Sequence, residues 1–411
     1  MPRPHAATRK TTLPQFLSTP SPRTAVSTFF AVVGFISAGW IARIPALTDK
    51  LGLDTAQLGT LLLFIAIGSI LAFQFIGRLI ERYGSDRTTF LFSLGFVTAL
   101  VLMALSPSPA VLAVTLFLYG AGFGATDVAM NAQGVTIEHR LKKPIMGSLH
   151  GYFSLGALLG GAISAVFAQF DIGLEANLVA FSVLGYGLVA WANTGQIRDE
   201  PIPADEAPKK KGLRFALPPR VLWPLGAIAF CGAVGEGAMA DWGALYVHDE
   251  LGGTEGMAAF GFTVFSTTML IGRFAGDKIV ARFGPGIVVR VGAIVSALGL
   301  TAGLLLGTTT SAIAGFAVMG IGLAFVFPVV YSAAGSTPGI PSGRGVAAVA
   351  TIGYTGFLAG PPLLGFLARA TSIQASLLVV AALIAIIAPF TGALRRPPTA
   401  PAGEESPAAA G

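Results

Sequence analysis

Twelve long apolar segments take up most of this 411-residue chain. They lie at residues 25–47, 57–80, 88–106, 109–136, 145–169, 175–194, 221–247, 257–280, 289–307, 310–334, 343–368 and 373–394. Each approaches or exceeds the roughly 20 residues that an α-helix needs to cross a bilayer. None shows the alternation of polar and apolar residues that the strands of a membrane barrel require. The sequence therefore predicts an all-α polytopic membrane protein with twelve transmembrane helices.

The composition excludes an ordinary soluble protein. Hydrophobic residues make up 54% of the chain and charged residues 11%, whereas about a quarter of the residues in soluble domains are charged. The 53 glycines suit membrane helices, where small residues let backbones approach closely. The one cysteine, Cys231, lies in an apolar segment, so it forms no intramolecular disulfide and is expected to be a small buried hydrophobe.

A second regularity is an internal repeat with an offset of 200 residues. It aligns Gly120-Ala121-Gly122 with Gly320-Ile321-Gly322, Gly156 and Gly160 with Gly356 and Gly360, and Arg82-Tyr83-Gly84 with Arg282-Phe283-Gly284. Each copy contains six of the apolar segments, and an even number of spans gives both copies the same orientation in the membrane. The sequence therefore predicts two parallel six-helix repeats, the plan of transporters whose halves rock around a midplane site.

The distribution of positive charge predicts the orientation. Of the 26 Lys and Arg residues, only Lys50 and Arg369 fall in loops expected outside the cell and Arg43 lies within a span, which leaves 23 on the side of the chain ends. Cytoplasmic loops carry such an excess, so both termini are expected in the cytoplasm. The pI of about 9.6 then reflects topology and contact with anionic lipid. Nucleic acid is not an expected partner, because the basic residues are not interleaved with aromatic ones.

Changes in composition predict the domain boundaries. The only sizeable internal break between apolar segments is rich in proline and charge and includes Lys209-Lys210-Lys211. The two ends of the chain are rich in Pro, Ser, Thr and Ala and have nothing apolar to bury, so they are expected to be disordered. The predicted division is a cytoplasmic tail at 1–23, an N-terminal six-helix bundle at 24–195, a cytoplasmic linker at 196–220, a C-terminal six-helix bundle at 221–394 and a second cytoplasmic tail at 395–411.

The segment after the second span carries a motif with a known parallel. Gly77-x3-Glu81-Arg82-x-Gly84, together with twelve spans in two halves, resembles the signature of the major facilitator superfamily. Glu81 replaces the usual Asp, and Ser85-Asp86 replaces the usual basic pair. The resemblance implies the fold of that superfamily and a latch of Gly77, Glu81, Arg82 and Gly84 that clamps the cytoplasmic helix ends in one state. The alternative is a tight turn whose charges only enforce topology.

The corresponding loop of the second half is expected to repeat this theme, with Gly272-Arg273-x-x-Gly276-Asp277-Lys278. In the fourth span, Gly122-x-Gly124-x-Thr126-Asp127-x3-Asn131 is similar to the fucose permease pattern, in which the acid serves proton-coupled sugar uptake. That pattern usually has Glu where this chain has Asp127, and often Pro where it has Ala132.

Overall, the chain most resembles the YbjJ-like branch of bacterial inner-membrane facilitators. The motifs that carry this resemblance are Trp40-x2-Arg43-Ile44-Pro45, Asn131-x-Gln133-Gly134-Val135, Ser148-Leu149-His150 and Glu236-Gly237-Ala238-x-Ala240-Asp241-Trp242. The resemblance implies a transporter of the bacterial cytoplasmic (inner) membrane, and it leaves the cargo undefined.

Ionisable residues inside spans are the strongest candidates for function, because each costs roughly 2.5–3.5 kcal/mol at the bilayer centre on insertion scales. Asp127 lies well inside the fourth span, and Asn131, four residues on, shares its face. A carboxylate whose wetting alternates would take up and release a proton, so Asp127 is predicted to couple transport to protons. The alternative is a structural hydrogen bond to Asn131 or to a neighbouring helix. His150 enters at a similar depth and is expected to face Asp127 and share its proton, or else to pack between helices.

Three further charged residues complete the polar candidates. Glu236 supplies a second titratable carboxylate, as symport requires. Arg43 and Asp241 are 198 residues apart, so the repeat places them at nearly equal depth on equivalent helices. They are predicted to pair when the external mouth closes and to separate when it opens. The alternatives are a permanent buried pair, or an Arg43 that extends outward alone.

Aromatic residues near these groups are candidates for the walls of a substrate cavity. The predicted substrate-binding residues are Asn131, Trp40, Tyr152, Trp242 and Tyr246. Trp242 and Tyr246 have an alternative assignment to the interfacial aromatic belt.

These features favour a secondary active transporter that moves a small polar or sugar-like solute with protons. The alternative is a proton-driven efflux antiporter for a hydrophobic compound, and a non-transporting sensor or scaffold is a third possibility. No metalloprotease, Walker or nucleophile-elbow motif and no cysteine cluster occurs, so enzymatic activity, a cofactor and a metal are not expected. The expected partners are the solute, protons and the lipid bilayer, and the expected state is a monomer.

Overall fold

The computed structural model describes residues 18–199 and 218–394. In the first range the helices are α1 (Pro22–Ile41), α2 (Ile44–Leu51), α3 (Thr55–Tyr83), α4 (Ser85–Ala104), α5 (Pro109–Leu141), α6 (Met146–Gln169) and α7 (Leu174–Asn193). In the second range they are η2 (Arg220–Leu222), α8 (Trp223–Ala238), η3 (Met239–Gly243), η4 (Tyr246–Glu250), α9 (Glu255–Phe283), α10 (Pro285–Leu305), α11 (Thr309–Leu323), α12 (Val326–Gly335), α13 (Ser342–Ala370), α14 (Ile373–Phe390) and η5 (Thr391–Leu394).

Twelve helical segments in the described ranges are long and apolar enough to cross a membrane, which confirms the predicted number. Two of them combine elements. The seventh runs from η2 through α8 into η3, and the tenth joins α11 to α12. The short helix α2 follows α1 and does not span. No strand occurs in the part of the chain that the structure describes.

The helix ends repeat with the offset read from the sequence. Helices α3 and α9 differ by 200 residues at both ends, and α4 and α5 begin 200 residues before α10 and α11. Side chains of Asp54 and Thr254 cap the starts of α3 and α9. Gly84 and Gly284 end them at φ values of 87° and 82°, which glycine adopts without steric cost. The same local chemistry therefore sets the same helix boundaries twice.

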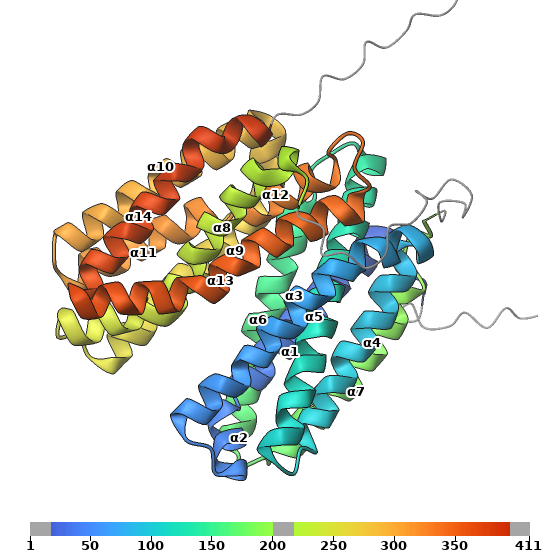
Figure 1. The fold of residues 1–411 in the computed structure, drawn as a ribbon, viewed down its shortest axis with the longest axis horizontal. Coiled ribbons are helices and arrows are strands. Elements are labelled where there is room, and N and C mark those ends of the chain that lie inside the picture. The colour runs from blue at the N-terminus through green and yellow to red at the C-terminus, as the bar shows by residue number, and fades with distance from the viewer. Residues whose placement is uncertain (1–17, 200–217, 395–411) are drawn as a thin grey trace, which may run out of the picture.

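Helices α1–α7 form one half and η2–η5 form the other, and Figure 1 shows the two halves meeting at one end and diverging at the other. Both ends of the described chain, and both edges of the undescribed segment 200–217, lie at the end where the halves meet. We call this the closed end and the opposite one the splayed end. The predicted boundaries of tails, linker and bundles remain predictions, because residues 1–17, 200–217 and 395–411 lie outside the described residues.

Glycines let helices within one half pack backbone to backbone. A Cβ added to Gly156 of α6 would lie 2.0 Å from the Ala31 carbonyl oxygen of α1, and one added to Gly34 of α1 would lie 2.0 Å from the Phe153 carbonyl oxygen of α6. Real Cβ atoms do not approach so closely, so only glycine fits at these crossings.

Two motif segments assigned to loops belong to helices instead. Residues 77–83 form the last turns of α3, and only Gly84 connects them to α4. The segment 272–278 lies inside α9, which runs on to Phe283. The reason is that a membrane helix continues past the apolar core into the polar interface, so charges there do not end it. Helix α1 likewise begins at Pro22, within the predicted tail.

The first four residues assigned to the linker pack on the N-terminal half. The Gln133 side-chain nitrogen donates to the Ile197 carbonyl oxygen at 2.7 Å, and the Ser85 backbone N–H donates to the Asp199 carboxylate at 2.9 Å. The boundary of the N-terminal half therefore extends beyond the last residue of α7.

Candidate functional site

Asp127 lies where the two halves meet and is hydrogen-bonded from both. It is 7% exposed in α5. One carboxylate oxygen accepts from the Asn131 side-chain nitrogen at 3.2 Å. The other accepts from the hydroxyls of Tyr331 in α12 and Tyr354 in α13, at 3.4 and 3.3 Å. Both tyrosines belong to the C-terminal half, so this carboxylate joins the halves.

Asn131 extends the cluster to His150. Its side-chain oxygen lies 3.1 Å from the His150 Nε2, and its nitrogen also donates to the Asp127 carbonyl oxygen at 2.8 Å. His150 stacks on Tyr331 with ring centroids 5.8 Å apart and contacts Phe30 at 5.2 Å. Within the described residues His150 forms no hydrogen bond to Asp127, and Asn131 contacts both side chains instead. His150 lies on α6 beside Asn131, and the Asn131 side-chain amide lies between His150 and Asp127.

Glu236 enters the same region through an arginine. An Arg273 Nη2 lies 3.1 and 3.3 Å from the two Glu236 carboxylate oxygens, and its Nη1 donates to the Ser154 hydroxyl of α6 at 2.7 Å. The Ser154 hydroxyl donates to the His150 carbonyl oxygen at 3.2 Å. Asp127, His150 and Glu236, three acid–base groups predicted from sequence, therefore belong to one connected network.

Aromatic rings surround this network. Tyr354 contacts Phe73, Phe123 and Phe357, with ring centroids 4.9, 6.3 and 5.8 Å apart. Phe357 also stacks on Phe327 at 6.0 Å and remains 37% exposed. A solute that reaches the network would therefore meet ring faces as well as polar groups.

Three residues of the network were missed in the sequence analysis as site candidates, although the repeat contains a signal for two of them. Tyr331 and Tyr354 are the 200-residue equivalents of Asn131 and Ser154. Equivalent positions in parallel repeats lie at the same depth, so both tyrosines could have been sought there. Arg273 has Phe73 as its equivalent and was assigned to a loop, which hid it.

Two predicted aromatic residues pack within their own half. Trp40 is 4% exposed and lies edge-on to Tyr119 with centroids 5.6 Å apart, both in the N-terminal half. Trp242 lies against Gly365, where an added Cβ would approach its ring at 3.2 Å. Neither of these contacts involves Asp127.

The other two predicted aromatic residues occupy opposite environments. Tyr246 is 1% exposed and its hydroxyl donates to the Leu304 carbonyl oxygen at 3.3 Å. In this conformation the π-helical turn η4 places Tyr246 inside the C-terminal half. Both expected roles, interfacial belt and substrate contact, stay predictions. Tyr152 is 37% exposed and packs edge-on to Phe274 of the C-terminal half, with ring centroids 5.4 Å apart.

The predicted gate residues lie apart in this conformation. Arg43 is 7% exposed and donates to the Ile172 carbonyl oxygen at 2.9 Å, while Asp241 is exposed. Neither makes an ion pair within the described residues. The expectation concerned a closed external mouth, so their pairing stays a prediction.

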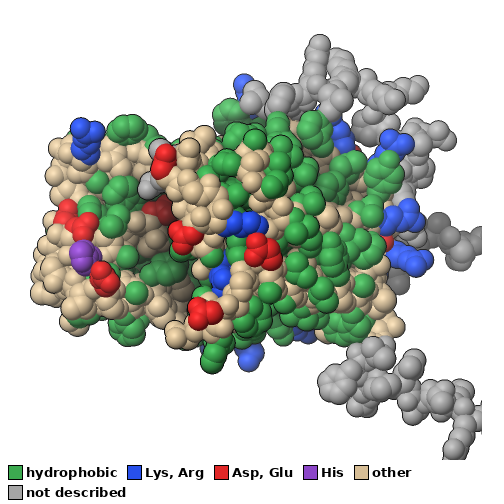
Figure 2. Space-filling model, turned by 90° about the horizontal axis from the view of Figure 1, so that it is seen from below, with side chains coloured by type: hydrophobic (Ala, Val, Ile, Leu, Met, Phe, Trp, Pro, Cys, Tyr) green, Lys and Arg blue, Asp and Glu red, His purple; other side chains and the backbone are tan. Residues whose placement is uncertain are grey.

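Charge differs between the two ends of the molecule. In Figure 2, Asp and Glu side chains and a histidine lie at the left and in the centre with a few Lys and Arg side chains among them, whereas the right side shows mainly Lys and Arg side chains. Exposed residues at the splayed end of the C-terminal half include His248, Asp249 and Glu250. The Asp249 carboxylate hydrogen-bonds the His248 ring and raises its pKa. The closed end is the more positive one.

At the closed end, a Glu81 carboxylate oxygen of α3 accepts from the Arg344 Nη2 of α13 at 2.6 Å. An added Cβ at Gly77 would lie 3.1 Å from the Arg344 Cα, so the glycine allows this approach. Arg82 takes no part, since its guanidinium lies over the ring of Tyr83 at 5.2 Å. The latch remains a prediction, with Arg344 as the partner that sequence reasoning missed.

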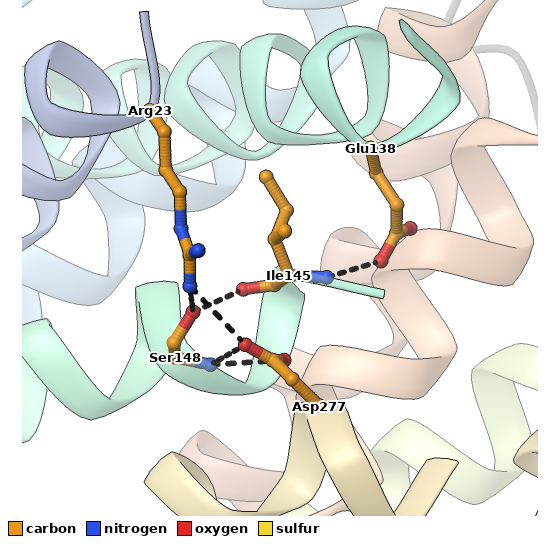
Figure 3. Close-up of polar contacts among 5 residues, drawn as sticks. All are labelled: Arg23, Glu138, Ile145, Ser148 and Asp277. Atoms are coloured by element: carbon orange, nitrogen blue, oxygen red, sulfur yellow. Dashed lines mark hydrogen bonds and ion pairs between the residues drawn. The ribbon is translucent and has the colours of Figure 1, made fainter. Parts of the chain in front are cut away.

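A second closed-end contact forms at the N-terminus of α6 (Figure 3). The Asp277 carboxylate of α9 accepts from the Ser148 backbone N–H at 3.1 and 3.2 Å, and Arg23 lies 3.7 Å from it. Glu138 of α5 accepts from the Ile145 backbone N–H at 2.9 Å. Acidic groups are favourable beside the first turn of a helix, and Asp277 supplies one from the opposite half.

A cavity of about 720 Å³ lies beside these contacts. Residues from both halves line it, including Glu138, Lys143, Leu225, Val280, Phe325 and Ser332. Polar contacts and ion pairs therefore hold this part of the closed end together around open space. Within the described residues, no group of three or more His, Cys, Asp or Glu side chains could hold a metal ion.

Comparisons with known proteins identify the family. The model of the Major Facilitator Superfamily matches residues 24–340 and 244–410. An uncharacterized transporter, y4wD, of Sinorhizobium fredii (strain NBRC 101917 / NGR234) is 31% identical over 378 residues, which cover 90% of this chain and 98% of the relative. An uncharacterized MFS-type transporter of Yersinia pestis is 34% identical over 370 residues, covering 89% and 94%. The YbjJ-like branch itself stays a prediction.

Solved structures show the same fold. The major facilitator transporter FucP in the outward conformation matches with a TM-score of 0.74 at 16% identity, covering 92% of this chain and 99% of that one. The human organic anion transporter MFSD10 matches with a TM-score of 0.73 at 15% identity, covering 91% and 99%. The fold, the twelve spans and the curated relatives agree with the expected class. The chain is a membrane transporter, not an enzyme, and it belongs to the Major Facilitator Superfamily.

Proposed function

We propose that this protein carries a small polar solute together with protons across the bacterial inner membrane by alternating access. The observation that carries the proposal is the buried Asp127 carboxylate, which accepts hydrogen bonds from both halves. Any movement of one half against the other changes the hydrogen bonds that Asp127 accepts. The charged form of Asp127 is costly inside a membrane unless it is solvated or hydrogen-bonded.

The proposed coupling follows from the change in hydrogen bonding when Asp127 takes up a proton. The ionised carboxylate accepts from Asn131, Tyr331 and Tyr354. Hydrogen bonds to a charged acceptor are roughly twice as strong as neutral ones. Protonation therefore weakens the contacts that tie α5 to α12 and α13. The halves can then separate at this level, as opening of the closed end requires.

The proposed orientation places the closed end in the cytoplasm and the splayed end outside, with the protein acting as a monomer. The more positive closed end supports this, because cytoplasmic segments carry the excess of Lys and Arg. A structure of the E. coli fucose:proton symporter FucP (N162A) matches with a TM-score of 0.72, and symport of the same kind is proposed here on the strength of Asp127. The rings around Tyr354 are the one observation that favours the alternative, efflux of a hydrophobic compound.

The test uses purified protein in proteoliposomes that contain a pH-sensitive dye. A panel of monosaccharides, polyols and organic acids is added outside, and a second panel contains hydrophobic cations such as ethidium. Symport predicts that an accepted solute drives protons inward, and that Asp127→Asn removes this proton movement while solute binding is retained. Efflux predicts instead that an imposed proton gradient drives ethidium against the direction of the protons. If no compound moves protons through the wild-type protein, the proposal is wrong.

A further inference from the structure

Arg273 occupies an unusual position for a permanent charge. Among the described residues only two Lys or Arg side chains are buried, Arg43 and Arg273. Arg43 follows the end of α1, whereas Arg273 lies in the seam between the halves, 7% exposed. An arginine so placed in a membrane protein marks a substrate or ion pathway more often than a structural site.

The partners of Arg273 leave part of its binding capacity unused. Its Nη2 faces the Glu236 carboxylate and its Nη1 faces the Ser154 hydroxyl, but its buried Nε has no hydrogen-bond partner. Guanidinium presents its N–H groups as a fork that matches a carboxylate in two parallel hydrogen bonds. The site therefore has the chemistry for a carboxylate in addition to, or in place of, Glu236.

We infer that the transported solute is a small organic anion with a carboxylate group, and that this carboxylate replaces Glu236 on Arg273 while Glu236 takes up a proton. The inference rests on the proposed function and names its substrate class. Charge balances in this exchange. Before it, the Arg273 cation faces the Glu236 anion; after it, the same cation faces the solute anion, and Glu236 is neutral. Binding of each anion therefore takes up one proton at Glu236, in addition to the proton that the proposed function assigns to Asp127. The exchange keeps an anion beside Arg273 throughout, because a buried guanidinium without an anion is strongly disfavoured.

The surroundings of Glu236 permit such an exchange. Its side chain remains 18% exposed, whereas that of Arg273 is 8% exposed, so the carboxylate is the more accessible partner. Phe357 lies beside the next residue, Gly237, where an added Cβ would be 3.4 Å from its ring. The exposed face of Phe357 can cover the apolar body of a bound solute. The cross-half contact from Arg273 to Ser154 then transmits occupancy to α6.

The groups that face Glu236 are few. Helix α8 packs against α11, α12, α13 and α14, and α11 and α14 carry no charged side chain. The titratable and charged groups around Glu236 are Arg273 of α9, Tyr331 of α12, Tyr354 of α13, Asp127 of α5 and His150 of α6, with Arg220 and Asp241 at the two ends of its own helix. Among these groups, Arg273 is the permanent cation at the depth of Glu236.

The first experiment measures binding to the full chain in lipid nanodiscs by isothermal titration calorimetry. The probes are acid–amide pairs of nearly equal shape, namely benzoate with benzamide and lactate with lactamide, together with gluconate and glucose. At least one acid is expected to bind at least tenfold more tightly than its neutral partner. Uptake of one proton per anion predicts about tenfold tighter binding for each unit of decreasing pH above the titration of Glu236.

Variants of Glu236 and Arg273 test the roles of the two residues separately. Glu236→Gln is expected to bind the acid with no dependence on pH, because the amide cannot exchange a proton. Arg273→Gln is expected to lose at least tenfold in affinity for the acid. Arg290→Gln, on the exposed side of α10, is the matched control and should bind like the wild type. Should Arg273→Gln fail to fold, the pH slope of Glu236→Gln still decides, and an unchanged slope would overturn the inference.

Flux through proteoliposomes distinguishes failure of the inference from failure of the proposed function. An anion that moves with the proton on Glu236 and the proton on Asp127 carries one net positive charge, so an inside-negative membrane potential set with potassium and valinomycin should accelerate acid uptake at least twofold, and an inside-positive potential should slow it. Neutral probes that drive protons, while acids do not, would overturn the anion inference and leave symport standing. Acids that bind through Arg273 without moving protons would instead overturn the proposed function. Binding of none of the acids also rejects the inference.

Discussion

At the scale of single residues, function depends on buried polar atoms for which the membrane offers no alternative hydrogen-bond partner. Asp127 is bonded by Asn131 in its own helix and by two tyrosines from the other half. The lipid cannot replace any of these donors, since hydrocarbon offers no hydrogen bonds. The hydrogen bonds of this carboxylate therefore change both when it takes up a proton and when the opposite half moves.

The first prediction concerns the proton on Asp127. Asp127→Asn keeps the size of the side chain and removes its titration, so transport should fall at least tenfold at neutral pH and lose the part of its pH dependence that Asp127 contributes, leaving the part due to Glu236. The measurement is solute uptake against external pH in proteoliposomes. Asn131→Ala, which removes a neighbouring donor but no proton, should lower the rate and retain a pH dependence. A pH profile of Asp127→Asn equal to that of the wild type would contradict the role.

The tyrosine hydroxyls give a second prediction at this scale. Tyr354→Phe removes one donor to Asp127 and keeps the ring contacts with Phe73 and Phe123. Hydrogen bonds to charged groups contribute about 1.5–3 kcal/mol, so the closed end should open more readily and Asp127 should be protonated at lower proton concentration. Accessibility of a cysteine introduced beside Asp127 to a cytoplasmic thiol reagent reports the opening. Phe123→Leu, which alters a ring but no hydrogen bond, is the control.

At the scale of elements, glycine sets how closely helices approach. Helices α1 and α6 cross at Gly34 and Gly156, where carbonyl oxygens fill the space of a side chain. Around Gly95 and Gly187, by contrast, nothing lies within 4 Å of an added Cβ. The same residue type therefore serves packing at some positions and is replaceable at others.

This difference yields a third prediction. Gly156→Ala should destabilise the protein by about 1–3 kcal/mol, the usual cost of adding a methylene to a filled site, because the Ala31 carbonyl belongs to a helix backbone that cannot yield locally. Thermal unfolding of the detergent-solubilised protein measures the effect. Gly187→Ala in α7 is the matched control and should leave the melting temperature within the error of the wild type or raise it slightly, since alanine favours helix. Equal shifts for both variants would refute the packing argument.

At the scale of the whole molecule, polar contacts between the halves hold the closed end, and within the described residues two of these seams contain an ion pair. One joins α3 to α13 through Glu81 and Arg344, and the other joins α9 to the N-terminus of α6 through Asp277. The first is partly solvated, with Arg344 43% exposed, and such ion pairs contribute about 0.2–1 kcal/mol. The first seam is therefore weak enough to break during a transport cycle.

The fourth prediction tests the first seam. Glu81→Gln should shift the population toward the state that is open at the closed end by roughly 1.4- to 5-fold, which corresponds to that energy range. Distances between spin labels on α3 and α13 measure the shift by pulsed electron resonance. Because Arg82 lies over Tyr83 rather than on Glu81, Arg82→Gln should change the distances less. A charge swap, Glu81→Arg with Arg344→Glu, should restore the wild-type distribution, and failure to do so argues against an ion-pair latch.

Much of the fold was readable from the sequence, and the site only in part. Apolar segments and the 200-residue repeat gave the number of spans and, with the signature at Gly77–Gly84, the superfamily. They also brought Asp127, Asn131, His150 and Glu236 forward as candidates. Arg273 was assigned to a loop and lies inside α9, and Tyr246 is buried in this conformation although its expected roles need an accessible ring. Periodic hydropathy reports whether a segment spans, but it does not report how far a helix continues beyond the apolar core or which way an irregular turn directs a side chain.

The sequence by itself determined the class of protein, its two parallel halves and the acids worth examining, because hydropathy, repeats and insertion costs are properties of one segment at a time. Only the tertiary structure decided which side chains these acids contact. Tyr331 and Tyr354 reach Asp127 across more than 200 residues, Arg344 meets Glu81 across 263, and Arg273 joins Glu236 to Ser154. Such contacts depend on the rotation and tilt of helices from different halves, which packing of the complete molecule fixes and no single segment encodes.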